Sequence, residues 1–393
     1  MIINKKEKEG EKMNFSFNSK VTIVGGDGCI KKNAKLFGAL GKRALVVTSK
    51  SAAKKSGALL DVTNALEQNS MRYDIFDGVT ENPLLSVVAE IGRIARESFA
   101  DYIIGIGGGS VLDAARAATL FAKNDFFEPS EVFEGKYAEA LPLVCVGTTA
   151  GTGSEVDSIS VITDDATEKK MSIKSPLLYA KYAFCDPKYT ATMDYRQTVS
   201  TALDALCHCL ESWFNRAATE TSDVFARRGV ELIYPNLMRL ALDKDAIYNK
   251  KFREEMYYGS LWGGLAIDLT GTGFPHPSGY ILTEECGIPH GVACALFETG
   301  FIRQSVKERP SENERLLLTV GTLDELCDTI TALTKNNIRL SKKVCDAIGE
   351  RLKYANNTKN TLGDFSWEKG KAIAESRFLD RNLIDGYKGR WVL

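Results

Sequence analysis

The sequence predicts an α/β domain followed by an all-helical domain, and two features of the chain carry this prediction. From residue 21 to residue 185, short β-branched or apolar segments alternate with helical patterns, which is typical of βαβ units and a mostly parallel sheet. After Asp186-Pro187 the strand signals stop, and apolar residues recur at helical spacing. We therefore predict a flexible leader over residues 1–12, an α/β domain over 13–190 and a helical domain over 191–393.

The individual elements follow from local composition. Short β-branched or apolar runs predict strands at 21–24, 44–48, 72–76, 102–106, 143–147, 159–163 and 182–185. Apolar residues at helical spacing predict helices between them at 30–40, 51–68, 85–99 and 110–122. The same spacing predicts later helices at 196–215, 222–243, 251–269, 292–306 and 323–334. The last forty residues are only weakly patterned.

Length and charge limit the class of protein. The chain has 393 residues, and single hydrophobic cores stop growing near about 250–300 residues, so two domains are expected. Lys and Arg total 50 and Asp and Glu total 51, a net charge of −1 without a long basic run, which gives no support to nucleic-acid binding. The longest apolar runs, 102–106 and 141–146, are far shorter than the roughly 20 residues of a membrane span. The leader lacks the apolar core of a signal peptide.

The nine cysteines point to a reducing compartment. Their number is odd, no C-x-x-C pair occurs, and most lie in apolar segments, where a free thiol behaves as a small hydrophobe. We expect a cytoplasmic protein without a disulfide framework.

A glycine-rich loop follows the strand predicted at 102–106. Glycines 107–109 lead into Ser110, which opens a helix, and Ser110 with Asp113 matches an S-x-x-D capping box. Glycine lets the backbone approach a ligand closely, and free N–H groups with the helix dipole favour an anion, so the segment predicts a phosphate site. The sixth position of a G-x-G-x-x-G frame from Gly105 is Ser110, so the usual dinucleotide fingerprint is not met.

A second polar loop follows the next predicted strand and is rich in hydroxyl groups. Its hydroxyl residues are Thr148, Thr149, Thr152 and Ser154. Because loops after neighbouring parallel strands meet at one carboxyl edge of the sheet, where open α/β sheets bind nucleotides, the two loops together predict a nucleotide site.

Only three histidines occur, and all lie in the helical half. Asp204 and His208 are four residues apart, which places a carboxylate and an imidazole on one helix face about one turn apart. Pro277, Gly279 and Pro289 forbid one continuous helix between the other two histidines, His276 and His290. A turn must therefore bring these two residues together. One carboxylate and three imidazoles suit Fe²⁺ or Zn²⁺.

Two cysteines, Cys207 and Cys209, flank His208 in the sequence. On a helix they point roughly 100° to either side of it, so we interpret them as core residues.

These segments together resemble the iron-containing (group III) alcohol dehydrogenases. The motifs that carry the resemblance are G-G-G-S-V-L-D (107–113), T-T-A-G-T-G-S-E-V (148–156), D-A-L-C-H-C-L-E (204–211) and G-F-P-H-P-S-G-Y with G-I-P-H-G-V-A (273–293). The resemblance covers roughly residues 15–310. It implies the dehydroquinate synthase-like fold, in which a dinucleotide-binding α/β domain and a helical metal-binding domain enclose the active-site cleft.

The resemblance also implies a set of site residues. The residues that look like the family's metal ligands are Asp204, His208, His276 and His290. The residues that match its cofactor loops are Gly107, Gly108, Gly109, Ser110, Asp113, Thr148, Thr149, Thr152 and Ser154. Lys170 falls near a family lysine that reaches the cofactor ribose. A homodimer or higher homo-oligomer is expected.

The chain departs from the family pattern in two places. Tyr280 stands where many members carry a further histidine associated with the active-site cleft and proton transfer. A phenol with a pKa near ~10 does not titrate near neutrality, so we expect Tyr280 to shape the catalytic cleft without acting as the proton shuttle. The region after about Glu308 matches the family poorly, and it normally lines part of the substrate cleft. The related glycerol dehydrogenases and dehydroquinate synthases lack a histidine at the position of His208, which favours the alcohol dehydrogenase branch.

The implied activity is hydride transfer between NAD(P)(H) and a small primary alcohol or aldehyde, with the metal as Lewis acid. Fe²⁺ is ranked over Zn²⁺ by the resemblance. One alternative is a non-redox metal enzyme of the dehydroquinate synthase kind, which would need basic residues near the metal, whereas residues 270–293 contain no Lys or Arg. The other is a catalytically degraded nucleotide-binding or assembly protein, against which the intact ligand set argues.

The end of the second strand predicts NADP(H) over NAD(H). A carboxylate there binds the ribose 2′-OH and repels a 2′-phosphate. This strand is followed by Ser49, and family members that exclude the phosphate resemble one another in having Asp at that place. Lys50, Lys54, Lys55 and a helix N-terminus near Ser51 add positive charge. The alternative is that a serine caps the helix and the lysines form a solvated face.

Overall fold

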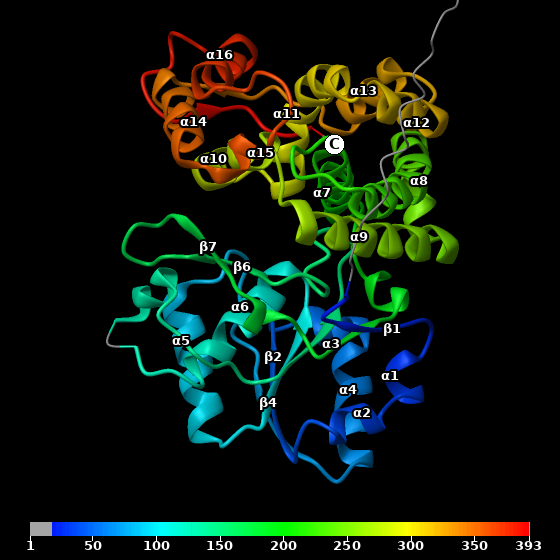
Figure 1. Cartoon of the computed structure of the whole chain (residues 1–393), viewed down its shortest axis with the longest axis vertical. Coiled ribbons are helices and arrows are strands. Elements are labelled where there is room, and N and C mark those ends of the chain that lie inside the picture. The colour runs from blue at the N-terminus through cyan, green and yellow to red at the C-terminus, as the bar shows by residue number, and fades with distance from the viewer. Residues whose placement is uncertain (1–17, 127, 393) are drawn as a thin grey trace, which may run out of the picture.

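The computed structural model describes residues 18–126 and 128–392, with the α/β half at the bottom of Figure 1 and the helical half at the top. The predicted leader at 1–12 lies outside the described residues. Six parallel strands form the main sheet in the order β1-β8-β5-β4-β2-β3. They are β1 (Thr22–Gly25), β2 (Arg43–Thr48), β3 (Arg72–Phe76), β4 (Tyr102–Gly107), β5 (Leu143–Gly147) and β8 (Tyr182–Cys185). The predicted α/β class is therefore confirmed.

The order of the strands creates a topological switch point. From β2 the chain runs outward to β3 and then returns to β4 on the other side of β2. Strand order reverses at this pair, and open α/β sheets bind ligands outside the carboxyl ends of strands at such a point. The glycine loop after β4 thus lies next to the end of β2, where Ser49 follows.

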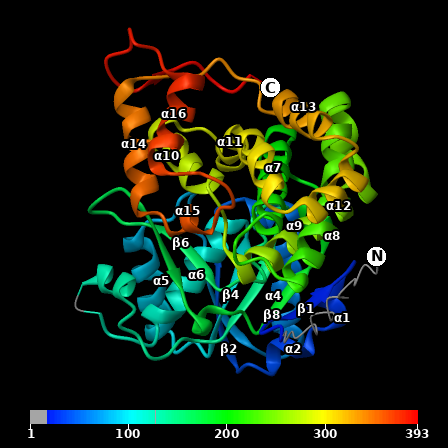
Figure 2. The ribbon, with the colours of Figure 1, turned by 45° about the horizontal axis from the view of Figure 1, so that its top comes forward.

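Helices cover both faces of the sheet, as Figures 1 and 2 show. The helical elements of this half are α1 (Cys29–Lys32), α2 (Lys35–Gly38), α3 (Ala52–Ser56), α4 (Ala58–Gln68), α5 (Leu85–Glu97), α6 (Gly109–Phe121) and the 3₁₀ turns η1 (Pro129–Glu134), η2 (Pro176–Leu178) and η3 (Pro187–Thr190). Side chains such as Val46 and Ile104 pack in the core beside α1–α4. Their neighbours Leu45 and Ile103 face the opposite way, into the core that contains α5 and α6, because side chains alternate along a strand.

Two predicted helices are each split in two. The segment 30–40 forms α1 and α2, and the segment 51–68 forms α3 and α4. Gly57 separates α3 from α4 with a φ of 82°, a left-handed conformation that ends a helix and that glycine adopts readily.

The predicted strand at 159–163 exists but lies outside the main sheet. It is β6 (Ile159–Thr163), and it pairs antiparallel with β7 (Lys170–Lys174), a strand that the sequence pattern did not predict. In β7 only Ile173 is buried, so the segment lacks the alternation of apolar and polar residues that marks a half-buried strand. This hairpin carries Lys170.

The second half is built from helices around a buried central helix. Its helices are α7 (Tyr195–Trp213), α8 (Glu220–Leu242), α9 (Lys250–Thr270), α10 (Pro275–Cys286), α11 (His290–Ser305), α12 (Pro310–Val320), α13 (Leu323–Leu333), α14 (Lys342–Tyr354), α15 (Asn356–Asn360), α16 (Trp367–Phe378) and the 3₁₀ turns η4 (Lys244–Tyr248) and η5 (Val306–Glu308). Helix α7 is buried almost throughout and packs against α8, α9 and α11. None of the described helices is both long and apolar enough to cross a membrane.

The helical C-terminal region predicted from the sequence is confirmed, apart from one pair of short strands. Two short strands, β9 (Arg339–Leu340) and β10 (Tyr387–Lys388), form an antiparallel pair that brings the end of the chain back to the segment before α14. Two residues per strand are too few to show a period in the sequence. The predicted boundary near residue 190 falls between β8 and α7, inside or next to η3.

Candidate active site

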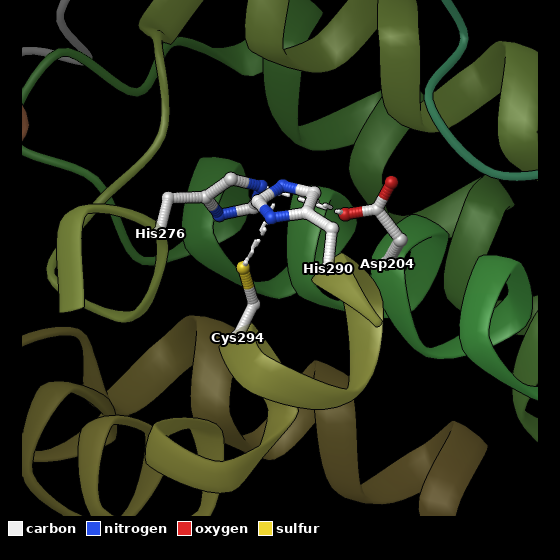
Figure 3. A group of neighbouring side chains, drawn as sticks. All are labelled: Asp204, His276, His290 and Cys294. Atoms are coloured by element: carbon white, nitrogen blue, oxygen red, sulfur yellow. Dashed lines mark hydrogen bonds and ion pairs between the residues drawn. The ribbon is translucent and has the colours of Figure 1, made fainter. Parts of the chain in front are cut away.

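The four predicted metal ligands come together from three helices. Asp204 and His208 lie one turn apart on α7, His276 lies in the first turn of α10, and His290 is the first residue of α11. Figure 3 shows His276, His290 and Asp204 pointing toward one another. Three of the four residues are buried, and His290 is partly exposed. As predicted, a turn separates the helices of His276 and His290, and Gly287 in that turn has a φ of 62°.

The distances suit a single small cation. Oδ1 of Asp204 lies 3.7 Å from Nε2 of His208, 3.6 Å from Nε2 of His276 and 3.7 Å from Nε2 of His290. Bonds of 2.0–2.1 Å in a tetrahedral site place neighbouring ligand atoms about 3.4 Å apart. Oδ1 is buried and has no hydrogen-bond partner among the described residues. Because a buried polar atom is normally paired, a carboxylate oxygen left open toward three imidazoles fits a divalent metal such as Fe²⁺ or Zn²⁺.

The electrostatics of the cluster favour the same conclusion. Burial raises the pKa of Asp204, but the three surrounding imidazoles outweigh it and hold this pKa below its usual range. Burial lowers the pKa of His290 to about 3, so the ring is in the neutral form that binds metals. Burial also lowers the pKa of His276, but Glu211 and Asp204 outweigh it and raise the value to about 10. Glu211 and Asp204 therefore favour positive charge at His276, which a metal cation would supply.

Close packing of α11 on α7 holds the cluster together. A Cβ atom at Gly291 would lie 1.9 Å from the backbone oxygen of Ser200 and 2.8 Å from Cβ of Asp204. Only glycine permits this approach, and it places His290, the preceding residue, beside the carboxylate.

Two residues beside the cluster were not predicted from the sequence. Glu211 lies 2.6 Å from Nδ1 of His276, and Sγ of Cys294 lies 3.7 Å from both ring nitrogens of His290, with its thiol turned toward the imidazoles in Figure 3. Their spacing was a usable signal, because Glu211 follows Asp204 by seven residues on one helix and Cys294 follows His290 by four. All nine cysteines are free and buried, including Cys207 and Cys209, as expected for core residues.

Tyr280 lies at the edge of the cluster. Its ring stacks on that of His290, with the ring centroids 5.2 Å apart and the planes 17° apart. The ammonium of Lys170 lies 5.6 Å from the Tyr280 centroid, and the guanidinium of Arg351 lies 5.2 Å from it. Burial raises the pKa of the phenol, so it stays protonated at neutral pH. Basic groups therefore do reach the edge of the cluster, although residues 270–293 contain none.

The predicted cofactor residues gather at the carboxyl edge of three neighbouring strands. Ser49 follows β2, the three glycines run from the last residue of β4 to the first residue of α6, and Thr148 follows β5. The two loops also pack on each other. A Cβ atom at Gly108 would lie 2.8 Å from Cγ2 of Thr149, and one at Gly109 would lie 2.6 Å from Cγ2 of Thr152. The glycines are thus needed for contact between the loops as well as for access to the backbone of α6.

The predicted capping box at the start of α6 is wrong. The N-cap is Gly108, without a side-chain cap, and Ser110 Oγ instead accepts a hydrogen bond from Asn82 N at 3.4 Å. Asp113 turns toward the hairpin, where it accepts the N–H of Val161 at 3.1 Å, and it pairs with Arg116 at 3.2 Å. A tertiary partner has overridden the local motif, and burial raises the pKa of Asp113 to about 7.

Arg116 organises the second cofactor loop and was not predicted as a site residue. It is fully buried, and its guanidinium donates hydrogen bonds to the carbonyl oxygens of Ser154, Ile159 and Leu178. Within the loop, the hydroxyl of Ser154 donates to Oγ1 of Thr152 at 3.0 Å. A single arginine among the four alanines of residues 114–118 was the available sequence signal.

The same loop reaches the helix that carries two of the metal ligands. A Cβ atom at Gly151 would lie 2.7 Å from Cβ of Thr201, which precedes Asp204 on α7 by three residues. The carboxyl edge of the sheet, where the predicted cofactor loops lie, is therefore adjacent to the metal cluster. We call this edge the cofactor edge.

A switch-point sheet with a glycine loop, beside an Asp/His₃ cluster, is the arrangement expected of a metal-dependent oxidoreductase with a nucleotide cofactor. The chain belongs to the iron-containing alcohol dehydrogenase family. The model for iron-containing alcohol dehydrogenase matches residues 20–187, and the model for the C-terminal part of the Fe-containing alcohol dehydrogenase family matches residues 198–376.

Individual relatives agree with this assignment. The sulfoacetaldehyde reductase of Bilophila wadsworthia is 32% identical over 286 residues, 71% of this chain and 72% of that protein. The lactaldehyde reductase of Escherichia coli is 32% identical over 259 residues, 65% of this chain and 66% of that protein. The crystal structure of an iron-containing alcohol dehydrogenase from Thermotoga maritima matches with a TM-score of 0.84 at 32% identity, covering 92% of this chain and 99% of that one.

The family match also corrects one expectation. It continues to residue 376, beyond the expected limit of the resemblance near residue 310. The conspicuous motifs end near His290, and the later helices α12–α16 contribute mainly spaced apolar residues, which are hard to recognise by eye in one sequence.

Proposed function

We propose that this chain is a metal-dependent, NAD(P)(H)-linked alcohol dehydrogenase that interconverts small primary alcohols and aldehydes, with Asp204, His208, His276 and His290 as its metal ligands. The observation that carries the proposal is the buried Oδ1 of Asp204, which has no hydrogen-bond partner among the described residues and lies 3.6–3.7 Å from three imidazole nitrogens. A bound Fe²⁺ or Zn²⁺ would supply a Lewis acid for the substrate oxygen. We rank Fe²⁺ first because the family is named for iron.

The protein's own residues would bind and orient the reactants. The start of α6 and the glycines before it offer N–H groups and a helix dipole to the pyrophosphate of the cofactor. The loop of Thr148, Thr149, Thr152 and Ser154 lies beside them and supplies hydroxyl groups. Because this loop also packs on α7, it would hold the nicotinamide near the metal cluster, and a fixed hydride distance lowers the barrier.

We further propose that NADP(H) is the preferred cofactor. Ser49 follows β2 at the switch point and adds no negative charge there, while Lys50 and Lys54 are close in sequence. Asp113 is committed to Arg116 and Val161, so it would support the cofactor loops from behind and would not bind the cofactor directly. Lys170 faces Tyr280 at the edge of the metal cluster, which favours a place near the nicotinamide end of the cofactor.

The relatives support short, functionalised aldehydes as substrates. Two of them are named for the reduction of sulfoacetaldehyde and lactaldehyde. Tyr280 would form part of the wall of this cleft, with its ring held against His290. A cytoplasmic location and a homodimer or higher oligomer complete the proposal, the former supported by nine free cysteines.

The test combines metal analysis with an aldehyde panel. The purified protein should contain about one divalent metal per chain, and it should oxidise NADPH in the presence of at least one short aldehyde. The proposal fails if the protein binds no Fe²⁺ or Zn²⁺, or if the metal-loaded protein oxidises neither NADPH nor NADH with any aldehyde. Metal binding without any redox turnover would instead favour a non-redox enzyme of the dehydroquinate synthase kind.

A further inference from the structure

Glu211 is a completely buried carboxylate with both oxygens engaged beside the metal cluster. It follows His208 by three residues on α7, so the two side chains lie on the same side of the helix. Its Oε1 lies 2.6 Å from Nδ1 of His276, and its Oε2 accepts the backbone N–H of Gly273 at 2.6 Å. The carboxylate therefore ties the central helix to the segment that leads into α10.

This contact determines which nitrogen of His276 faces the cluster. An ionised carboxylate only accepts hydrogen bonds, so Nδ1 donates its hydrogen to Glu211, and Nε2 is left as the nitrogen whose lone pair a metal can take. Nε2 is the atom that lies 3.6 Å from Oδ1 of Asp204 and 2.9 Å from Nε2 of His208. Carboxylates in this position orient metal-binding imidazoles and make them more basic ligands.

We propose that Glu211 is the positioning residue of the metal centre, and that it fixes the tautomer and the ring orientation of His276 so that the ligand atoms converge on one cation. The inference rests on the metal centre proposed above. Glu211 acts through His276 and contacts neither substrate nor cofactor.

Glu298 on α11 provides a matched control. It is also completely buried, and a carboxylate oxygen of Glu298, one of Glu211 and the thiol of Cys207 all lie within 4.8 Å of one another. Neither oxygen of Glu298 has a hydrogen-bond partner among the described residues. If the proximity of a buried carboxyl group were enough, both glutamates would affect the affinity for the metal. If the hydrogen bond to His276 is what matters, only Glu211 will affect this affinity.

The experiment compares the wild-type chain with Glu211→Gln and Glu298→Gln, using Co²⁺ as the probe. Glutamine has the shape of glutamate but only one acceptor oxygen for two N–H donors, so its amide NH₂ must face either Gly273 or His276. Co²⁺ affinity is measured by competition with a chelator, and the visible spectrum of the saturated protein reports the coordination geometry. We expect Glu211→Gln to weaken Co²⁺ binding by about 10–100-fold and to change the spectrum. We expect Glu298→Gln to match the wild type in both Co²⁺ affinity and visible spectrum.

Three results would contradict either the positioning role of Glu211 or the metal centre on which it rests. If Glu211→Gln binds Co²⁺ as the wild type does and with the same spectrum, the positioning role is wrong. If Glu298→Gln weakens binding equally, the effect is not specific to the bond with His276, and the inference is again wrong. A wild-type chain that binds no Co²⁺ contradicts the proposed metal centre itself, and the inference falls with it.

Discussion

Each half of the molecule buries a cluster of charged side chains, and the two clusters differ in how completely their members are paired. In the α/β half, Arg116 donates to three carbonyl oxygens and lies 3.2 Å from the carboxylates of both Asp113 and Asp157. In the helical half, Oδ1 of Asp204 faces three imidazoles and has no hydrogen-bond partner among the described residues.

This difference separates a structural cluster from a functional one. A buried charge is tolerated when it is paired and hydrogen-bonded, and Arg116 meets that condition with groups of its own chain. In the Asp204 cluster, Oδ1 has no hydrogen-bond partner among the described residues, and a cation held by the four ligands would supply its partner. The first cluster should therefore govern stability, whereas the second should govern metal binding and turnover.

The largest effect is expected from removing one of the proposed metal ligands. His276→Ala removes one ligand, so we expect it to lose the metal and to lower kcat/KM for an aldehyde by at least roughly a thousandfold, since a Lewis acid contributes several kcal/mol. NADPH binding should remain, because the nucleotide loops belong to the other half. Metal analysis, turnover assays and the fluorescence of bound nucleotide check these three expectations. The control is Cys209→Ala, a change in the core that should leave the metal bound. Survival of metal content and rate in both His276→Ala and His290→Ala would show that the ligand assignment is wrong.

Breaking the cluster around Arg116 should lower the stability of the folded protein. Arg116→Met leaves the buried Asp157 and the partly buried Asp113 without their cationic partner, so we expect the free energy of unfolding in urea to fall by about 3–5 kcal/mol. Arg93→Met is the matched control, because the exposed pair of Arg93 with Glu97 is open to solvent and should matter little. Equal effects of the two replacements would contradict the structural role of Arg116.

A smaller effect is expected at the cofactor edge. Ser49→Asp adds a carboxylate that repels a 2′-phosphate, so the ratio of kcat/KM for NADPH to that for NADH should fall about tenfold, which corresponds to 1.4 kcal/mol. Ser49→Ala controls for loss of the hydroxyl. The structure places Ser51, not Ser49, at the N-cap of α3, so a capping role does not compete at this position. A wild-type preference for NADH, or an unchanged ratio in Ser49→Asp, would overturn the cofactor assignment.

The smallest effect is expected at Tyr280. Tyr280→Phe keeps the ring against His290 and removes only a hydroxyl whose pKa burial raises, so most of kcat should remain at pH 7. A loss of a hundredfold or more in steady-state turnover would place the phenol in proton transfer.

The sequence was informative where chemistry and local pattern coincide. Strand β4 is a continuous apolar run ending in glycines, and all three histidines of the chain belong to one cluster, so both were predictable. The fold class was predictable for the same reason, because the alternation of strands and helices is itself a local pattern.

The rest depends on contacts between distant segments. Asp113 satisfies a capping motif locally, but Arg116 and the N–H of Val161 draw its carboxylate away. Strand β7 exists because it pairs with β6, although its own residues are mostly exposed. Arg351 reaches Tyr280 from α14, 71 positions along the chain, and no local pattern reports such a contact.

The most direct measurement is the effect of metal on thermal unfolding of the metal-free chain. A ligand that binds only the folded state stabilises it, by about 2.7 kcal/mol when its concentration is one hundred times its Kd. We predict that Fe²⁺ under anaerobic conditions, or Zn²⁺, raises the Tm of the wild type and leaves that of the isosteric variant Asp204→Asn nearly unchanged. An equal rise in both proteins, or no rise in the wild type, would contradict the claim that the open carboxylate of Asp204 is the centre of a metal site.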